Sequence, residues 1–196
     1  MALPLLWIGA AALSALTVKE LADDRKKQQK QRYKSARPET LADLARHESP
    51  VAVYPSDIFR TQQISEPAIG AVVCCGIGGV LEHTGIWVGD DTIVELDGNG
   101  LIKAISSKRF TKERSGDKIF VACDSMGNAL ACEVAAQRAI EQIFQYQDYH
   151  LFDNNCHHFI WQCFQPNDLS LTTFKSLNVR LASMFDRKIY WDQCKV

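Results

Sequence analysis

The chain has 196 residues, of which 46% are hydrophobic and 23% are charged. This length and composition predict one domain with a packed core and exclude a largely disordered chain. The formal net charge of −1 argues against a dedicated nucleic-acid-binding protein, which would carry a basic excess.

An apolar segment opens the chain. Residues 1–18 carry no charge, residues 19–37 have a net charge of +5, and residues 38–196 have a net charge of −6. As a helix, residues 1–18 would span about 27 Å, close to the roughly 30 Å hydrocarbon core of a bilayer. We therefore interpret residues 1–18 as a single transmembrane anchor. A cleavable signal peptide and a buried core helix are the alternatives, although no positive segment precedes the apolar run.

The basic segment 19–37 contains neither Gly nor Pro, so we expect it to form a solvated helical neck. Positive charge on this side of an anchor predicts an external N-terminus and a cytoplasmic body. The neck would also rest on anionic lipid head groups. The seven cysteines cannot all pair within one chain, and this independently favours a reducing compartment.

Residues 38–66 are interpreted as a linker or entry segment with one short helix over 40–47. Beyond it, apolar and alternating runs predict strands over 69–75, 83–88, 92–96, 101–105 and 118–123. Gly89-Asp90-Asp91, between the second and third of these, is typical of a hairpin loop. The glycine-rich segment 76–79 has neither a Walker lysine nor GxGxxG spacing, which argues against a phosphate-binding loop.

Helical spacing of apolar residues then predicts three helices, over 129–146, 156–164 and 171–185. The first would bury Val134, Ile140, Ile143 and Phe144. Strands followed by helices are typical of an α+β fold, here an antiparallel sheet packed on helices. Residues 166–196 are expected to form a helical tail that packs on the core, in which Tyr190 and Trp191 could contact a membrane or a partner.

Cys156 has the surroundings of a nucleophile. It follows Asp153-Asn154-Asn155, a strong helix-capping sequence, at the start of an apolar helix. The positive end of the helix dipole should lower the pKa of its thiol, and the unsatisfied N–H groups of the first turn could serve an oxyanion. The other six cysteines are interpreted as ordinary reduced residues.

His83 is the candidate base for this thiol, because it alone among the five histidines opens a strand of the hairpin. If Gly89-Asp90-Asp91 forms a three-residue loop, Glu95 lies opposite Gly85 and shares a face with His83. Glu95 could then orient the imidazole as the third member of a triad. A two-residue loop would place the two side chains on opposite faces, so the prediction depends on the turn.

A metal site formed by Cys156, His157, His158 and Cys163 is a weaker interpretation. Adjacent histidines on a helix point about 100° apart, and no CxxC pair completes a ligand set. One of the two histidines is expected to be partly exposed, and the other to be packed or to line the site. We therefore predict no metal and no cofactor.

Two segments resemble the lecithin:retinol acyltransferase-like family. The segment from His83 to Asp90, HTGIWVGD, is similar to the H-x-G-I-Y-x-G-D segment of that family, and NCHHFI over 155–160 is similar to N-C-E-H-F-V. The resemblance covers about 67–165. It implies a circularly permuted papain-like thiol enzyme, in which His83 and Cys156 are the catalytic pair.

The sequence departs from that family's pattern at two site positions. Glu95 stands where phospholipid-acting members often have a second histidine, and His157 stands where glutamate usually follows the cysteine. The anchor is N-terminal, whereas several lipid-acting relatives carry theirs at the C-terminus.

These observations predict a membrane-anchored thiol acyltransferase or hydrolase acting through an acyl-thioenzyme on a phospholipid or other acyl-lipid. Its expected organisation is an anchor over 1–18, a neck over 19–37, a linker over 38–66, the catalytic domain over 67–165 and a tail over 166–196. The alternatives are a peptidase or amidase of the permuted papain group acting on cell-wall peptide, and a non-catalytic membrane-tethered binding module. No nucleic-acid partner is expected.

Overall fold

The computed structural model of the chain describes residues 52–53, 64–77, 82–112, 114, 118–168, 171 and 173–196. The expected anchor over 1–18, the neck over 19–37 and the short helix over 40–47 lie outside these ranges. Within the described ranges, no helix has both the length and the apolar character needed to cross a membrane.

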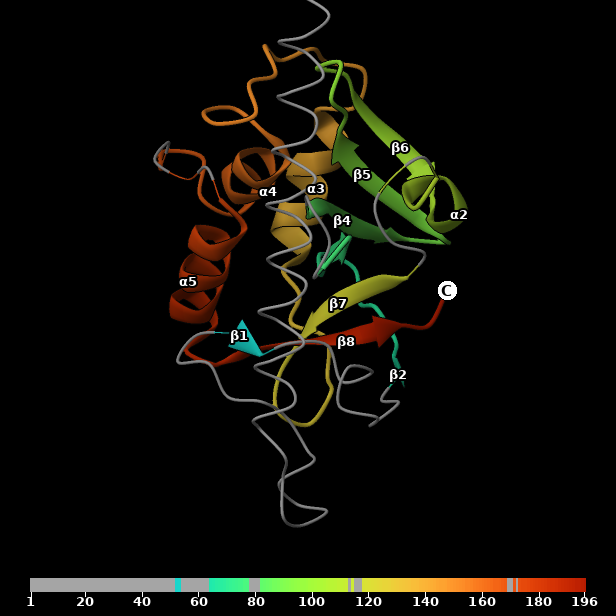
Figure 1. The fold of residues 1–196 in the computed structure, drawn as a ribbon, viewed down its shortest axis with the longest axis vertical. Coiled ribbons are helices and arrows are strands. Elements are labelled where there is room, and N and C mark those ends of the chain that lie inside the picture. The colour runs from blue at the N-terminus through green and yellow to red at the C-terminus, as the bar shows by residue number, and fades with distance from the viewer. Residues whose placement is uncertain are drawn as a thin grey trace, which may run out of the picture.

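Eight strands of the described chain form one sheet in the order β1-β8-β7-β3-β4-β5-β6, with β2 also paired to β8 (Figure 1). The strands are β1 (Ala52–Val53), β2 (Ile64–Ser65), β3 (Val72–Cys75), β4 (His83–Gly89), β5 (Thr92–Leu96), β6 (Ile102–Ser106), β7 (Ile119–Cys123) and β8 (Ile189–Cys194).

The strand pairs from β8 to β6 are antiparallel, as predicted. The expectation of a wholly antiparallel sheet is wrong at the other edge, where β1 and β2 both pair with β8 in parallel. The reason is that β1 and β2, which precede the main strands in the sequence, lie beside β8, the last strand, and run in the same direction as it.

The described helices are α2 (Ser107–Phe110), α3 (Glu133–Glu141), α4 (Cys156–Phe164) and α5 (Phe174–Phe185). Figure 1 shows α3, α4 and α5 together on one side of the sheet, where they share one buried apolar cluster with alternate strand residues. A second buried cluster covers the opposite face of the sheet and includes Phe110 of α2. The mixed α+β class predicted from the sequence is therefore correct.

Helix α3 is shorter than predicted and buries a different face. Its buried residues are Ala135, Ala136 and Ala139, whereas Val134 and Ile140 are exposed. Small side chains allow α3 to pack closely against α4 and the sheet, so the larger apolar residues face outward. Phe144 adopts a positive φ of 71° beyond the helix end and is 82% exposed. The predicted apolar face was therefore wrong at Val134, Ile140 and Phe144, whereas Ile143 packs partly buried against the core as expected.

The last thirty residues are an integral part of the fold. They contain helix α5, as predicted, and also strand β8, which lies between β7 and the short strands β1 and β2. Trp191 is 2% exposed and donates its indole N–H to Asn178 Oδ1 over 2.8 Å. Tyr190 is also buried. The tail packs on the core as expected, but the expectation of a purely helical tail was wrong. Tyr190 and Trp191 are buried within the fold, so the expected contact of these two residues with a membrane or a partner was also wrong.

Candidate active site

Cys156 lies at the first position of α4, where the preceding residue caps the helix. The side-chain oxygen of Asn155 accepts hydrogen bonds from the backbone N–H groups of His157 and His158, over 3.0 and 3.1 Å. The amide group of Asn155 also donates to the Leu151 carbonyl over 2.9 Å. Cys156 is thus held, 4% exposed, at the positive end of the helix dipole.

The β4–β5 hairpin sets the relation between His83 and Glu95. Ile86 pairs with Val94 and Trp87 with Ile93, and this register continues to place Glu95 opposite Gly85. The loop itself is a two-residue turn, because Gly89 pairs with Thr92 and the register shifts between Trp87 and Gly89. This irregularity adds one residue to β4. His83 and Glu95 therefore lie on the same face of the hairpin, as a three-residue loop would have placed them.

His83 and Glu95 are in direct contact as a result. His83 Nε2 lies 2.9 Å from Glu95 Oε2, and the Glu95 carboxylate is fully buried. The His83 ring also packs on Phe110 with ring centroids 5.3 Å apart. Gly85 allows this approach, since a Cβ at that position would lie 2.4 Å from Ile93 and 3.0 Å from Phe110.

Cations surround the Glu95 carboxylate. Two N–H groups of Arg114 donate to its two oxygens over 2.7 and 2.8 Å, and Lys103 Nζ lies 3.6 Å away. Asp97 in turn pairs with Lys103 over 3.0 Å. A cavity of about 300 Å³ opens beside these residues and is lined mainly by charged side chains.

The contacts of Glu95 explain its pKa. Burial would raise that pKa, but hydrogen bonds and attraction to His83 and Arg114 outweigh it and lower the pKa from 4.5 to about 2. For His83, burial would lower the pKa, whereas hydrogen bonding and attraction to Cys156 and Glu95 raise it above 6.5. The pair therefore favours an ionised carboxylate and a protonated imidazole.

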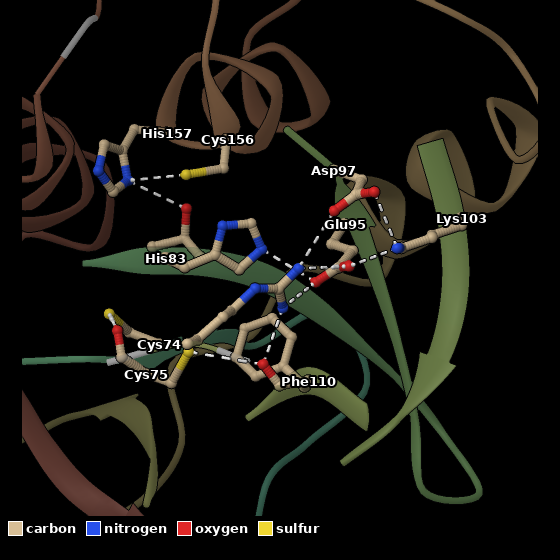
Figure 2. A network of polar contacts seen from close by, with 11 residues as sticks. Cys74, Cys75, His83, Glu95, Asp97, Lys103, Phe110, Cys156 and His157 are labelled. Carbon is tan, nitrogen blue, oxygen red and sulfur yellow. Dashed lines mark hydrogen bonds and ion pairs between the residues drawn. The ribbon is translucent and has the colours of Figure 1, made fainter. Parts of the chain in front are cut away.

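The Cys156 thiol has a lowered pKa, whereas the pKa of this imidazole is raised. Burial alone would raise its pKa, yet hydrogen bonding and attraction to His157 and His83 bring the pKa well below 9.0. Burial has the opposite outcome at Cys75, Cys163 and Cys194, raising each pKa to about 12. Figure 2 shows the His83 ring between the Cys156 sulfur and the Glu95 carboxylate.

A comparison with protein families adds to this geometry. The model of the family described as lecithin retinol acyltransferase matches residues 65–167, more than half of the chain. The protein belongs to the lecithin retinol acyltransferase family. None of the curated proteins matches the chain. The matched span of this family member contains His83, Glu95 and Cys156.

His157 is the residue at which the sequence departs from the family's cysteine segment, and it lies in the candidate site. Its Nδ1 lies 3.8 Å from Cys156 Sγ and 3.1 Å from Thr84 Oγ1. His158 packs away from the sulfur, with its Nδ1 3.0 Å from the Leu171 carbonyl oxygen. Both are buried, so the expectation that one would be partly exposed was wrong. Within the described residues, no group of three or more metal-ligating side chains is arranged to hold a metal ion.

Sequence reasoning brought Cys156, His83 and Glu95 to one site, and the structure places all three there. It missed Arg114 and Lys103, which neutralise Glu95. Lys103 pairs with Glu95 across β5 and β6, and that register could have indicated it. Arg114 follows α2 in a polar segment without periodicity, so no sequence pattern indicated its contact with Glu95.

Proposed function

We propose that the protein is a thiol acyltransferase or hydrolase in which Cys156 is the nucleophile, His83 the acid and base, and Glu95 the residue that orients His83. One observation carries this proposal: a buried cysteine with a lowered pKa begins a helix beside an imidazole that is hydrogen-bonded to a buried carboxylate. Membership of the lecithin retinol acyltransferase family supports the same chemistry.

In the first half-reaction, the Cys156 thiolate attacks the carbonyl carbon of an ester, thioester or amide. The positive end of the α4 dipole stabilises the oxyanion of the tetrahedral intermediate, whereas the N–H groups of His157 and His158 already donate to Asn155. Protonated His83 gives its proton to the leaving group as the bond to that group breaks. The products are a free alcohol, thiol or amine and an acyl-thioenzyme.

In the second half-reaction, neutral His83 accepts a proton from water or from an acceptor alcohol or amine. The oxygen or nitrogen of that molecule attacks the thioester carbonyl, the C–S bond breaks, and its electron pair returns to Cys156 as a thiolate. Glu95 keeps its charge throughout, because Arg114 stays charged and donates to both of its oxygens at every stage. Water as the acceptor makes the enzyme a hydrolase, and a second substrate makes it a transferase.

The proposed substrate is a phospholipid or another acyl-lipid. The apolar segment 1–18 would anchor the chain, and the basic segment 19–37 would hold it against anionic head groups on the cytoplasmic side. The segment before α4 supports a position near lipid, since Phe144, Tyr146 and Phe152 are 82%, 73% and 78% exposed. An exposed aromatic residue thus lies four positions before Cys156.

A circularly permuted papain-like arrangement is the finer fold that we propose. In this chain the strand that carries His83 precedes the helix that begins with Cys156. His83 and Cys156 meet at the site although 72 residues lie between them in the sequence. This order agrees with the family's cysteine and histidine segments.

Lipid mass spectrometry of cells expressing the wild type or C156A tests the proposed function. We expect the wild type to change the acyl-lipid profile and C156A to leave it as in cells without the protein. C163A is the matched control, because Cys163 is buried in the same helix and has a raised pKa. If C156A changes the profile as the wild type does, Cys156 is not the nucleophile.

A topology reporter at the C-terminus tests the proposed location. We expect a cytoplasmic C-terminus, because segment 19–37 follows the apolar segment and carries the positive charge. An external C-terminus would contradict the cytoplasmic lipid substrate and favour a peptidase.

A further inference from the structure

His157 is a buried imidazole at the sulfur that the mechanism through His83 leaves without a role. It is 7% exposed and directly follows Cys156. Its Nδ1 lies 3.8 Å from Cys156 Sγ and 3.1 Å from the hydroxyl oxygen of Thr84. One ring nitrogen thus faces the nucleophile and a hydroxyl group at the same time.

The two imidazoles approach the sulfur from different elements. Figure 2 shows the Cys156 sulfur between His157, which belongs to α4, and His83, which belongs to β4. Thr84 follows His83 in β4, is fully buried and contacts His157. Strand β4 therefore supplies one imidazole directly and fixes the other through the neighbouring hydroxyl group.

Two further contacts hold His157, one at its backbone and one at its ring. Its backbone N–H donates to the Asn155 side chain over 3.0 Å, and its ring packs on Phe174 with centroids 5.6 Å apart. These contacts restrict the ring to the position beside the sulfur. A fixed donor costs little reorganisation when charge develops on its acceptor.

Two protonation patterns are compatible with these contacts. If Nδ1 carries the hydrogen, it can donate both to Thr84 Oγ1 and to a thiolate. If Nδ1 is bare, its single lone pair accepts a hydrogen bond from Thr84, and Nδ1 offers no hydrogen to the sulfur. A buried thiolate beside an acceptor nitrogen is less stable than one beside a donor, so the ionised form of Cys156 selects the first pattern.

We propose that His157 is a second catalytic histidine, whose Nδ1–H donates a hydrogen bond to the Cys156 thiolate while Thr84 keeps the ring in place. This inference rests on the proposed function, since it requires Cys156 to be the nucleophile. His157 neither gains nor loses a proton, and both proton transfers remain with His83. Its contribution is to stabilise the negative charge on sulfur before attack and again when the C–S bond of the acyl-enzyme breaks.

Thr84 provides a hydrogen-bond partner for His157 while the acyl-enzyme exists. When the sulfur is bonded to an acyl group, it no longer carries the charge that attracts Nδ1–H. The hydrogen bond to Thr84 then satisfies this buried donor until the thiolate returns. A glutamate in place of His157 would bring a negative charge near the thiolate and no donor, so the substitution H157E reverses the proposed effect.

The rate of Cys156 alkylation by iodoacetamide, measured across pH, tests this proposal without any acyl substrate. The full-length protein is used, and mass spectrometry of the Cys156 peptide separates this thiol from the other six. We expect H157Q to move the midpoint of the profile up by about one pH unit or more, which is about tenfold less thiolate below the midpoint. T84V should move it in the same direction by less, and H157E by more.

H158Q is the matched control, because His158 is equally buried in the same turn but contacts the Leu171 carbonyl and not the sulfur. We expect its profile to coincide with that of the wild type. The proposal is overturned if H157Q matches the wild type, or if H158Q moves the midpoint as far as H157Q does. If wild-type Cys156 reacts no faster than a peptide thiol, the proposed function itself fails.

Nitrogen NMR of the wild-type protein gives a second test that does not depend on how the variants fold. We expect Nδ1 of His157 to be protonated at the pH where Cys156 is a thiolate. A bare Nδ1 in that state would overturn the proposal and leave the mechanism through His83 unaffected.

Discussion

At the scale of single residues, the site depends on a buried charge that is compensated from several sides. Glu95 is fully buried, and it keeps its charge because Arg114, His83 and Lys103 contact its carboxylate. A buried charge without such partners would be strongly unfavourable. The stability of the protein should therefore depend on the ionisation of this one group.

We expect the free energy of unfolding to fall as the pH drops from about 4.5 to about 2. The folded-state pKa of Glu95 lies below its ordinary value of 4.5, so its contribution is complete above that value and lost as the carboxylate is protonated. The difference corresponds to about 3 kcal/mol. Urea unfolding at several pH values measures it, and E95Q should remove this part of the pH dependence. An unchanged dependence in E95Q would contradict the assignment.

We expect R114M to lower the free energy of unfolding by about 3 kcal/mol, because Glu95 would remain buried without its main partner. R114K should cost less, since lysine keeps the charge but cannot bind both carboxylate oxygens at once. K108M, at an exposed position of α2, is the control for urea unfolding. Equal stability of R114M and K108M would refute a structural role for Arg114.

At the scale of the elements, the hairpin shows how far the sequence could lead. The strand pattern indicated which residues face each other, and His83 and Glu95 do share a face. The type of turn was harder to predict from the sequence, because Asp90 and Asp91 both adopt positive φ angles and β4 contains one extra residue. A two-residue turn and a bulge together give the same register as a three-residue loop.

Helix α3 shows where periodicity fails. Alanine occupies the face that packs against α4, and the larger apolar residues lie outside. A pattern of large apolar residues cannot reveal a close contact built from small ones. Helix α4 was predicted correctly because its cap, its apolar content and its following proline all agree.

The cap of α4 links stability to reactivity. We expect N155A to lower the free energy of unfolding by about 1 kcal/mol, because two N–H groups lose their acceptor. N155D should retain the cap, but its carboxylate would lie beside the Cys156 thiolate and raise the pKa of that thiol. Thermal unfolding and the alkylation profile measure the two effects separately. A profile for N155D that coincides with the wild type would contradict this reasoning.

At the scale of the whole molecule, the domain extends beyond the segment that resembles the family. The family match ends at residue 167, yet strand β8 lies next to β7 in the same sheet and buries Trp191. The sequence offered no clear signal for β8, because its apolar residues alternate only weakly with polar ones. Pairing between distant parts of the chain decided its structure.

We therefore expect a chain truncated after residue 168 to lose cooperative unfolding. Truncation removes α5 and β8 and exposes the apolar surface that they cover. Circular dichroism during heating measures this, with removal of only the exposed Val196 as the control. A truncated chain that unfolds at the same temperature as the full chain would show that the tail is dispensable.

The central claim is that an acyl group passes through Cys156. Incubation of the purified protein with a short-chain phospholipid, followed by acid quenching and peptide mass spectrometry, tests it most directly. We predict an acyl mass on the Cys156 peptide of the wild type and none in H83A at neutral pH. An acyl group on another residue, or turnover by C156A at the wild-type rate, would contradict the claim.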